Sequence, residues 1–155
     1  MAVLIDSPDA RREPDREQFH LEGWVSTAPF EDLLQMQIES AGEGRAVLCM
    51  PFTVKHAMGA GLMHGGALTS LADTAVAMAI KSLLPRGTHF ATIDLQGRFL
   101  APVRSGDVRA VAQVSGPEGR DFQGDAMLYD KEGREVFHFT SRFRVARGQG
   151  YDDPE

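Results

Sequence analysis

The longest apolar segment of the chain, GALTSLADTAVAMAIKSLL at Gly66–Leu84, limits the possible folds more than any other feature. Its Ala, Leu and Met content and its length predict a helix, which Pro85 and the glycine two residues later would end. Apart from a few small hydroxyl residues, its polar side chains are Asp73 and, near the end, Lys81. A helix that is apolar on nearly all sides must be wrapped by other structure, so we expect a sheet around it.

Most of the remaining chain reads as strands that would do this wrapping. A short helix is predicted at Pro29–Leu34, and the last strand would place Phe137, Phe139, Phe143 and Val145 on one face. The segment Arg45–Phe52 is apolar on both faces, which indicates burial on both sides. The pattern predicts an α+β domain. The predicted strands are LLQMQIESAG (33–42), Arg45–Phe52, His89–Leu100, Asp107–Ser115, Asp121–Tyr129 and Glu135–Val145, with turns at Ser115–Gly119 and Asp130–Gly133.

The chain of 155 residues suits one domain, expected at 19–147, between mobile tails at 1–18 and 148–155. A formal net charge of −6 without a basic stripe argues against nucleic-acid binding, and no apolar run is long enough to span a membrane. Cys49 is the only cysteine, so an intrachain disulfide is excluded and a Cys-based zinc site is disfavoured. The N-terminus lacks the pattern of a secretory signal, and these features together fit a cytoplasmic protein.

Asp73 is out of place in the middle of an apolar helix. An Asp there has poor helix propensity, and a carboxylate without partners in an apolar setting costs several kcal/mol or raises its pKa. One explanation is a structural Asp, bonded to a hydroxyl or a backbone N–H. The other is a catalytic carboxylate, because groups with shifted pKa values gather at functional sites. The helix alone leaves both explanations open.

The residues before the helix favour the catalytic explanation. His64, Gly65 and Gly66 stand directly at the predicted helix start, where backbone N–H groups lack partners and the helix dipole is positive. Glycines allow a substrate to approach this backbone closely, so a carbonyl oxygen or an oxyanion would be stabilised there. A tight turn would also explain two adjacent glycines. The glycine pair and the mid-helix carboxylate mean more together than either does alone.

Helix geometry separates these two features. Gly65 and Asp73 are eight positions apart, which places them about 12 Å apart along the helix axis at the usual rise per residue. A base or nucleophile must come within about 3–3.5 Å of the reacting centre. One chain therefore cannot readily use both on one carbonyl group. If both residues are catalytic, each site combines them from two chains, and we expect a homodimer or a tetramer of two such dimers.

The segment HGGALTSLADTA, His64–Ala75, resembles the hotdog-fold thioesterases of the phenylacetyl-CoA thioesterase branch. In that branch an Asp follows the His of a His-Gly-Gly motif by nine positions, as Asp73 follows His64 here. The later stretch TIDLQGRFLAPVRSGD, Thr92–Asp107, is similar to the next strand of the family. The similarity covers about Arg45 to Arg147. It implies a hotdog fold, in which a long central helix is wrapped by a curved antiparallel sheet of five to six strands.

The resemblance also implies roles for individual residues. The Gly65 N–H would hold the thioester carbonyl oxygen, with Gly66 beside it, and Asp73 of the partner chain would act as general base or nucleophile. Thr92 matches a hydroxyl residue that orients the water or the carboxylate, and His64 would lie near the thiol leaving group or support the loop. Relatives often carry a polar residue where this chain has Met58, so either His56 or another group substitutes, or Gly65 acts alone.

Other candidate residues have weaker patterns. Arg98 and Arg104 flank the FLAPV turn and would suit the phosphates of coenzyme A, although solvated surface arginines are commoner. We interpret Asp94 as structural and Cys49 as a packing residue. The sequence has no G-x-S-x-G motif and no H-E-x-x-H spacing, which argues against a serine hydrolase and a metal site.

The leading hypothesis is hydrolysis of an acyl-CoA thioester to a carboxylic acid and free coenzyme A, with water as second substrate and without a metal or other cofactor. The alternative is a non-catalytic module that binds acyl-CoA. A hotdog hydratase ranks third, because those enzymes usually carry a different Asp and His signature.

Overall fold

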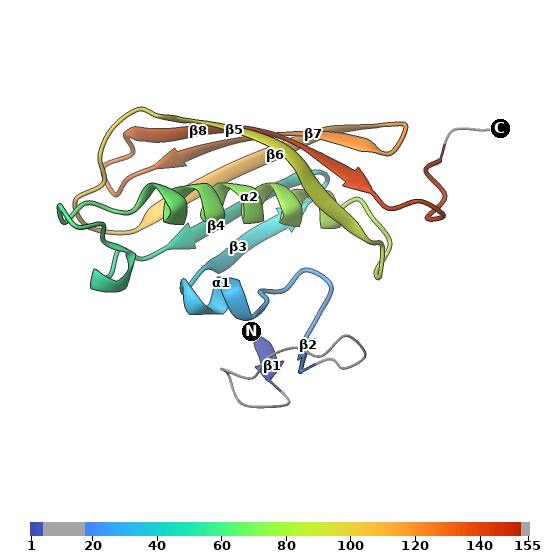
Figure 1. Cartoon of the computed structure of the whole chain (residues 1–155), viewed down its shortest axis with the longest axis horizontal. Coiled ribbons are helices and arrows are strands. Elements are labelled where there is room, and N and C mark those ends of the chain that lie inside the picture. Colours follow the sequence, from blue (N-terminus) through green and yellow to red (C-terminus); the bar gives the residue numbers. More distant parts are fainter. Residues whose placement is uncertain (5–17, 153–155) are drawn as a thin grey trace.

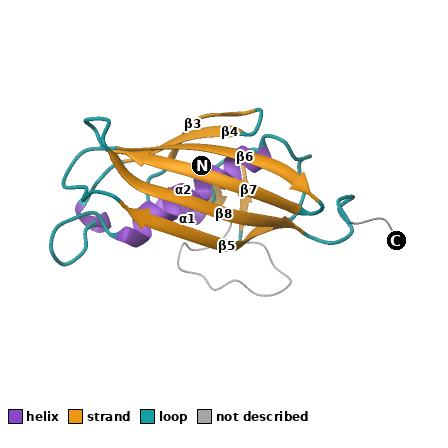
Figure 2. Cartoon of the chain, turned by 90° about the horizontal axis from the view of Figure 1, so that it is seen from above, coloured by secondary structure: helices purple, strands orange, loops and turns teal. Residues whose placement is uncertain are grey.

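The computed structural model describes residues 1–4 and 18–152. A six-stranded antiparallel sheet in the order β3-β4-β6-β7-β8-β5 curves around one long helix, α2 (Figures 1 and 2). This arrangement confirms the predicted α+β class and the hotdog fold. The strands and helices are β1 (Ala2–Leu4), β2 (Phe19–Leu21), α1 (Pro29–Leu33), β3 (Gln37–Gly42), β4 (Arg45–Met50), α2 (Gly65–Lys81), β5 (Phe90–Phe99), β6 (Val108–Glu118), β7 (Asp121–Tyr129) and β8 (Glu135–Val145), with a 3-10 turn at Val54–His56.

The helix α2 lies where the apolar segment predicted it. Leu71, Ala75 and Ile80 on its sheet-facing side are fully buried, and their neighbours along this side are buried as well. The side that the sheet leaves uncovered is narrow, and its members recur every three or four residues, as one helix face requires. These half-buried or exposed residues are Gly66, Thr69, Ser70, Asp73, Ala77 and Lys81, and Gly65 in the first turn is half-buried as well. The helix is thus wrapped on most sides and open along one stripe, which we call the open stripe.

The strand pattern is confirmed in outline and wrong in two details. On β8 the predicted face of Phe137, Phe139, Phe143 and Val145 is buried against α2. On β4 only one face is buried, because Val47 and Cys49 lie half-buried on the convex side, where no helix covers the sheet. The turn expected at Ser115–Gly119 begins later, since β6 continues to Glu118.

The N-terminal part of the chain packs beside the helix and the β3 edge. β1, in the segment predicted as a mobile tail, pairs with β2 at the start of the predicted domain, while residues 5–17 and 153–155 of the two predicted tails lie outside the described residues. Trp24 closes the end of α2: its indole N–H donates to the Lys81 and Leu84 carbonyl oxygens, at 3.0 and 3.1 Å. In the described part of the chain, no helix is long and apolar enough to cross a membrane.

Candidate active site

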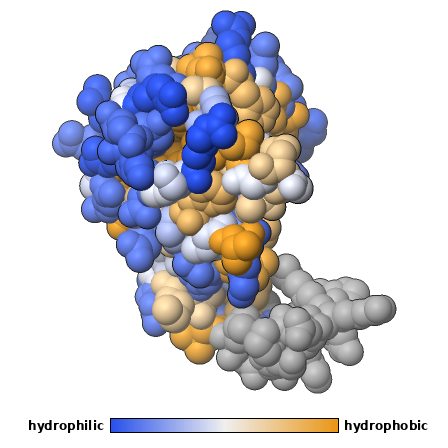
Figure 3. All heavy atoms as spheres, turned by 90° about the vertical axis from the view of Figure 1, so that its left-hand side faces the viewer, coloured by the Kyte–Doolittle hydropathy of each residue, from blue (hydrophilic) through white to orange (hydrophobic). Residues whose placement is uncertain are grey.

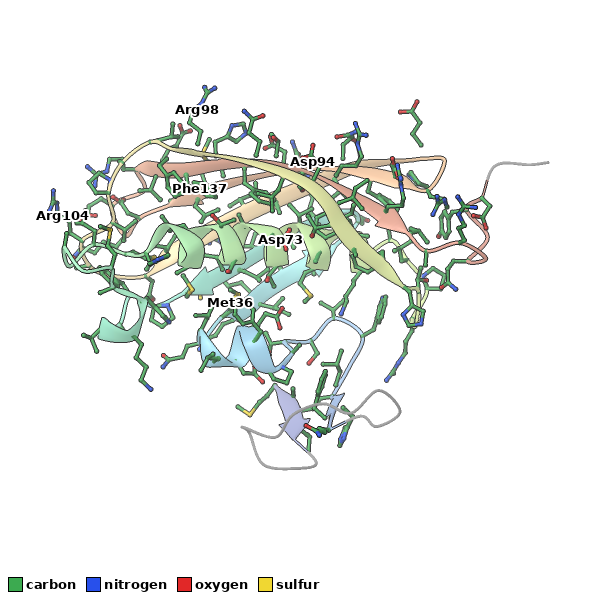
Figure 4. The ribbon with its side chains drawn as sticks, in the orientation of Figure 1. Met36, Asp73, Asp94, Arg98, Arg104 and Phe137 are labelled. Atoms are coloured by element: carbon green, nitrogen blue, oxygen red, sulfur yellow. The ribbon has the colours of Figure 1, made fainter. Side chains whose placement is uncertain are left out.

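Asp73 lies on the open stripe of α2, half-buried, in the middle of the helix (Figure 4). The Thr92 hydroxyl of β5 donates a hydrogen bond to its carboxylate at 2.9 Å. Burial raises the pKa of the Asp73 carboxyl above its usual range, the Thr92 hydrogen bond opposes this, and the negative charge of Glu31 on α1 adds to it. A carboxylate that is partly desolvated yet reachable is suited to take up a proton.

A β-bulge aims Thr92 at this carboxylate. The pairing of β5 with β8 shifts register between Thr92 and Asp94, so Ile93 is the extra residue. Leu95 pairs with Ser141 and Thr92 with Phe143, both on the helix side of β8, whereas strict alternation would give Thr92 and Leu95 opposite faces. The bulge therefore places the Thr92 hydroxyl on the side of the sheet that faces α2.

The start of α2 carries the second group of predicted residues. His64 is the N-cap, and its Nδ1 accepts a hydrogen bond from the Gly66 N–H at 2.8 Å. This acceptor role assigns the ring proton to Nε2. The N–H groups of Ala67 and Leu68 reach the His64 carbonyl oxygen. No residue that the structure describes accepts a hydrogen bond from the Gly65 N–H. The cap thus leaves one backbone donor available, and it is the donor that the sequence singled out.

The ring of Phe99 lies directly against Gly65. A Cβ at Gly65 would stand 2.9 Å from the ring Cζ, closer than real Cβ contacts, so Gly65 must lack a side chain for the ring to lie there. The ring also packs on Phe137, with ring centroids 4.7 Å apart, and residue Phe99 is still 59% exposed. The sequence analysis missed Phe99 as a site residue. Its signal was weak, because the contact depends on where the end of β5 crosses the helix.

Two residues near the helix start differ in their freedom to contact a substrate. Met58 is 41% exposed in a tight turn, where its backbone N–H and carbonyl oxygen bond with Leu62 and Gly61. His56 is buried, its Nδ1 lies 2.6 Å from the Pro51 carbonyl oxygen, and its own carbonyl oxygen accepts from the His64 N–H. His56 therefore holds the loop before α2, while Met58 is the more accessible side chain.

The structure separates the two predicted arginines. Arg98 points away from α2 on the convex side of the sheet, and Arg104 lies at the end where α2 begins (Figure 4). The loop of Arg104 is tied to the residues before the helix by a 3.0 Å hydrogen bond from the Met63 N–H to the Val103 carbonyl oxygen. Arg104 borders a depression that Lys131 and Arg134 also line. Of the two arginines, Arg104 lies nearer to the helix start.

Within one chain, the predicted site residues thus fall into two groups. Asp73 and Thr92 form one, and His64, Gly65 and Gly66 form the other, which Phe99 joins. Apolar side chains gather on the face at the helix-start end of the molecule (Figure 3). Asp94 lies on the convex face, opposite Arg142, outside both groups.

Comparisons with known proteins show the family of the chain and support its fold. A family model described as the thioesterase superfamily matches residues 60–137, a range that contains both groups. A Halobacterium salinarum protein named "Putative esterase" is 35% identical over 99 residues, which are 61% of this chain and 65% of that protein, so the match spans just under two thirds of its length.

Two solved structures share the fold. The E. coli PaaI protein from the phenylacetic acid degradation operon gives a TM-score of 0.72 at 29% identity, covering 79% of this chain and 87% of that one. A conserved protein from Pseudomonas aeruginosa gives a TM-score of 0.74 at 25% identity, covering 79% and 97%.

Proposed function

Because the chain belongs to the thioesterase superfamily, we propose that it hydrolyses acyl-CoA thioesters, with Asp73 as the catalytic carboxylate and the Gly65 N–H as the donor to the carbonyl oxygen. The observation that carries this proposal is the half-buried Asp73 carboxylate on the open stripe, held by Thr92. A structural Asp would be enclosed by its partners. This carboxylate has one hydrogen-bond partner among the described residues and retains access to solvent.

In the proposed reaction, the Asp73 carboxylate removes a proton from water as the water oxygen attacks the thioester carbon. The developing oxyanion accepts a hydrogen bond from the Gly65 N–H, at the positive end of the α2 dipole. When the carbon–sulfur bond breaks, the proton held by Asp73 passes to the departing thiolate. Direct attack by Asp73 would give a mixed anhydride that water then cleaves, and it uses the same residues.

The site we propose is shared between two chains. The separation of Gly65 from Asp73 along α2 requires a partner, and the open stripe with the free edge of β5 offers a surface for one. On β5 the side chains of Ile93 and Leu95 are each nearly half exposed, which is unusual for large apolar residues beside a helix. A second copy of the chain would cover them and bring its Asp73 to the first copy's Gly65.

The substrate's coenzyme A portion is proposed to extend toward Arg104. This side chain lies at the helix-start end, beside Lys131. Asp130 and Glu132 line the same depression, and Asp130 pairs with Arg134 at 3.0 Å, so Arg104 and Lys131 carry the positive charge that this proposal uses. Arginine suits phosphate oxygens because its planar fork donates two parallel hydrogen bonds. Arg98, on the convex face, is the weaker candidate for this role.

A thiol-release assay tests the proposal with acetyl-, hexanoyl-, lauroyl-, benzoyl- and phenylacetyl-CoA. We expect the wild type to release coenzyme A from at least one of them, and Asp73→Asn to lower kcat/KM about 1000-fold, within the usual range for loss of a general base. The matched control is Asp94→Asn, which removes an exposed carboxylate from the convex face of the same region and should change kcat/KM less than 2-fold.

The same proteins separate the enzyme from the non-catalytic binding module. Calorimetric titration with a non-hydrolysable acyl-CoA thioether measures binding without turnover. Binding by a wild type that releases no coenzyme A would favour the module and refute the enzyme. Full activity in Asp73→Asn would keep the enzyme class and refute the role of its carboxylate.

A further inference from the structure

The Phe99 ring occupies the space next to the only helix-start N–H without an acceptor among the described residues. The amide nitrogen of Gly65 and the position that a Cβ would take are both attached to the Gly65 Cα. Two atoms of the Phe99 ring lie 2.9 and 3.0 Å from that Cβ position. A group that accepts a hydrogen bond from this N–H therefore comes into the neighbourhood of the ring. Phe99 as a residue is 59% exposed, so it can offer surface to that group.

The ring is held so that it cannot easily move away. Phe99 pairs with Phe137 across β5 and β8, and their ring centroids lie 4.7 Å apart. Phe137 is fully buried, and its own ring lies over Gly97, where a Cβ would stand 2.4 Å from it. Phe137 is also in contact with Phe139. Phe137, which lies between the sheet and α2 (Figure 4), thus supports one side of the Phe99 ring.

We propose that Phe99 is a specificity-determining residue of the thioester site, and that it selects acyl groups that are flat at the carbon bonded to the carbonyl, such as aryl and 2-enoyl groups. This inference rests on the proposed function, because it takes the Gly65 N–H as the donor to the thioester oxygen. An acyl-CoA bound there presents the carbonyl and the adjacent carbon to the ring.

The preference follows from shape and from the support behind the ring. A planar conjugated group can lie offset-stacked on an aromatic face and gains about 0.5–1.5 kcal/mol beyond its area burial. When the carbon bonded to the carbonyl carries two or three methyl groups, it is bulky on both faces and cannot stack on the ring. Such a substrate must displace the ring or bind with its carbonyl oxygen farther from the Gly65 N–H. Because the Phe99 ring packs on the fully buried Phe137, displacement toward Phe137 disturbs a buried contact rather than a loose side chain.

The test compares kcat/KM for benzoyl- and crotonyl-CoA, which are flat at that carbon, with isobutyryl- and pivaloyl-CoA, which are branched there. We expect the wild type to favour the flat pair. Phe99→Ala should lower the flat-to-branched ratio about 10-fold, the size of effect that a changed apolar pocket usually has, and Phe99→Leu should lower it less. The matched control Val111→Ala shortens another exposed apolar side chain, on the convex face, and should leave the ratio unchanged.

The outcomes separate the inference from the function on which it rests. A flat-to-branched ratio that Phe99→Ala and Phe99→Leu leave within 2-fold of an active wild type overturns the inference and leaves the thioesterase intact. A wild type that prefers the branched pair overturns it as well. A wild type that releases coenzyme A from no acyl-CoA, in either panel, refutes the proposed function instead. Thermal unfolding of each variant identifies a loss of folding, and Phe99→Leu keeps apolar bulk so that one variant remains informative.

Discussion

The first turn of α2 and its middle carry the two halves of the candidate site, and they differ in charge, burial and type of chemical group. The first turn is uncharged and offers a backbone donor, the Gly65 N–H, beside an exposed aromatic ring. The middle carries the half-buried carboxylate of Asp73, which accepts a hydrogen bond from Thr92 and is affected by the negative charge of Glu31. One half can stabilise a developing negative charge, and the other can take up a proton. A continuous helix keeps them apart, so in the site that we propose each half would need its counterpart from a second chain.

The largest effect is expected when the two halves are impaired in different chains and then mixed. Gly65→Ala places a Cβ beside the N–H, in the space where the thioester must approach and where the Phe99 ring already stands, and Asp73→Asn removes the base, so each homodimer should lose most activity. In a heterodimer, one site would combine both defects and the other would have none. Random mixing should therefore recover about a quarter of wild-type activity per site, which is on the order of 100-fold above either parent.

Differently tagged chains allow the heterodimers to be purified after co-expression and assayed for thiol release. Purified heterodimers should have about half of the wild-type activity, because one of two sites is intact. The matched control combines two Asp73→Asn chains with different tags, which should stay inactive. Heterodimers no more active than the parents would rule out sites shared between chains.

The sequence predicted the parts of the candidate site that lie on α2 better than the parts that lie on β5. The apolar run, the glycine pair and the spacing from His64 to Asp73 are all local, so the helix, its start and its odd carboxylate could be found from the sequence. The bulge at Ile93, which turns Thr92 toward Asp73, depends on the pairing of β5 with β8 and leaves no local pattern. The contact of Phe99 with Gly65 and the electrostatic influence of Glu31 on the Asp73 carboxyl join segments that are distant in the sequence. Such contacts become visible only in the folded chain.

A smaller effect is expected when the Thr92 hydroxyl, which donates a hydrogen bond to Asp73, is removed. Thr92→Val keeps the shape of the side chain and removes the hydrogen bond to Asp73. This bond holds down the pKa of the Asp73 carboxyl, so its loss should raise that pKa further and leave less of the ionised base near neutral pH. We expect kcat/KM to fall about 10-fold, in line with the worth of a hydrogen bond to a charged group. The rising limb of the pH profile of kcat/KM should move to higher pH.

Thr92→Ser restores a hydroxyl at the same position and should return the limb toward its wild-type place. Gly65→Ala serves as the comparison from the other half of the site, since it should lower kcat/KM without moving the limb. A Thr92→Val profile that only drops, with no shift along the pH axis, would show that the hydroxyl does not tune Asp73.

The smallest effect concerns Glu31 of α1, whose negative charge also raises the pKa of the Asp73 carboxyl. Glu31→Gln keeps an acceptor for the Ala28 N–H, to which the Glu31 carboxylate bonds at 2.9 Å, and removes the charge. In the proposed mechanism Asp73 acts in its ionised form, so a lower pKa of its carboxyl extends the active pH range to lower pH. The rising limb of the pH profile should therefore move to lower pH, opposite to the shift expected for Thr92→Val. The Glu31 effect is Coulombic and should shrink as salt is added, whereas the Thr92 effect is a direct contact and should persist. Profiles of both variants measured at low and at high salt distinguish the two causes, and a shift of Glu31→Gln to higher pH would contradict the assignment.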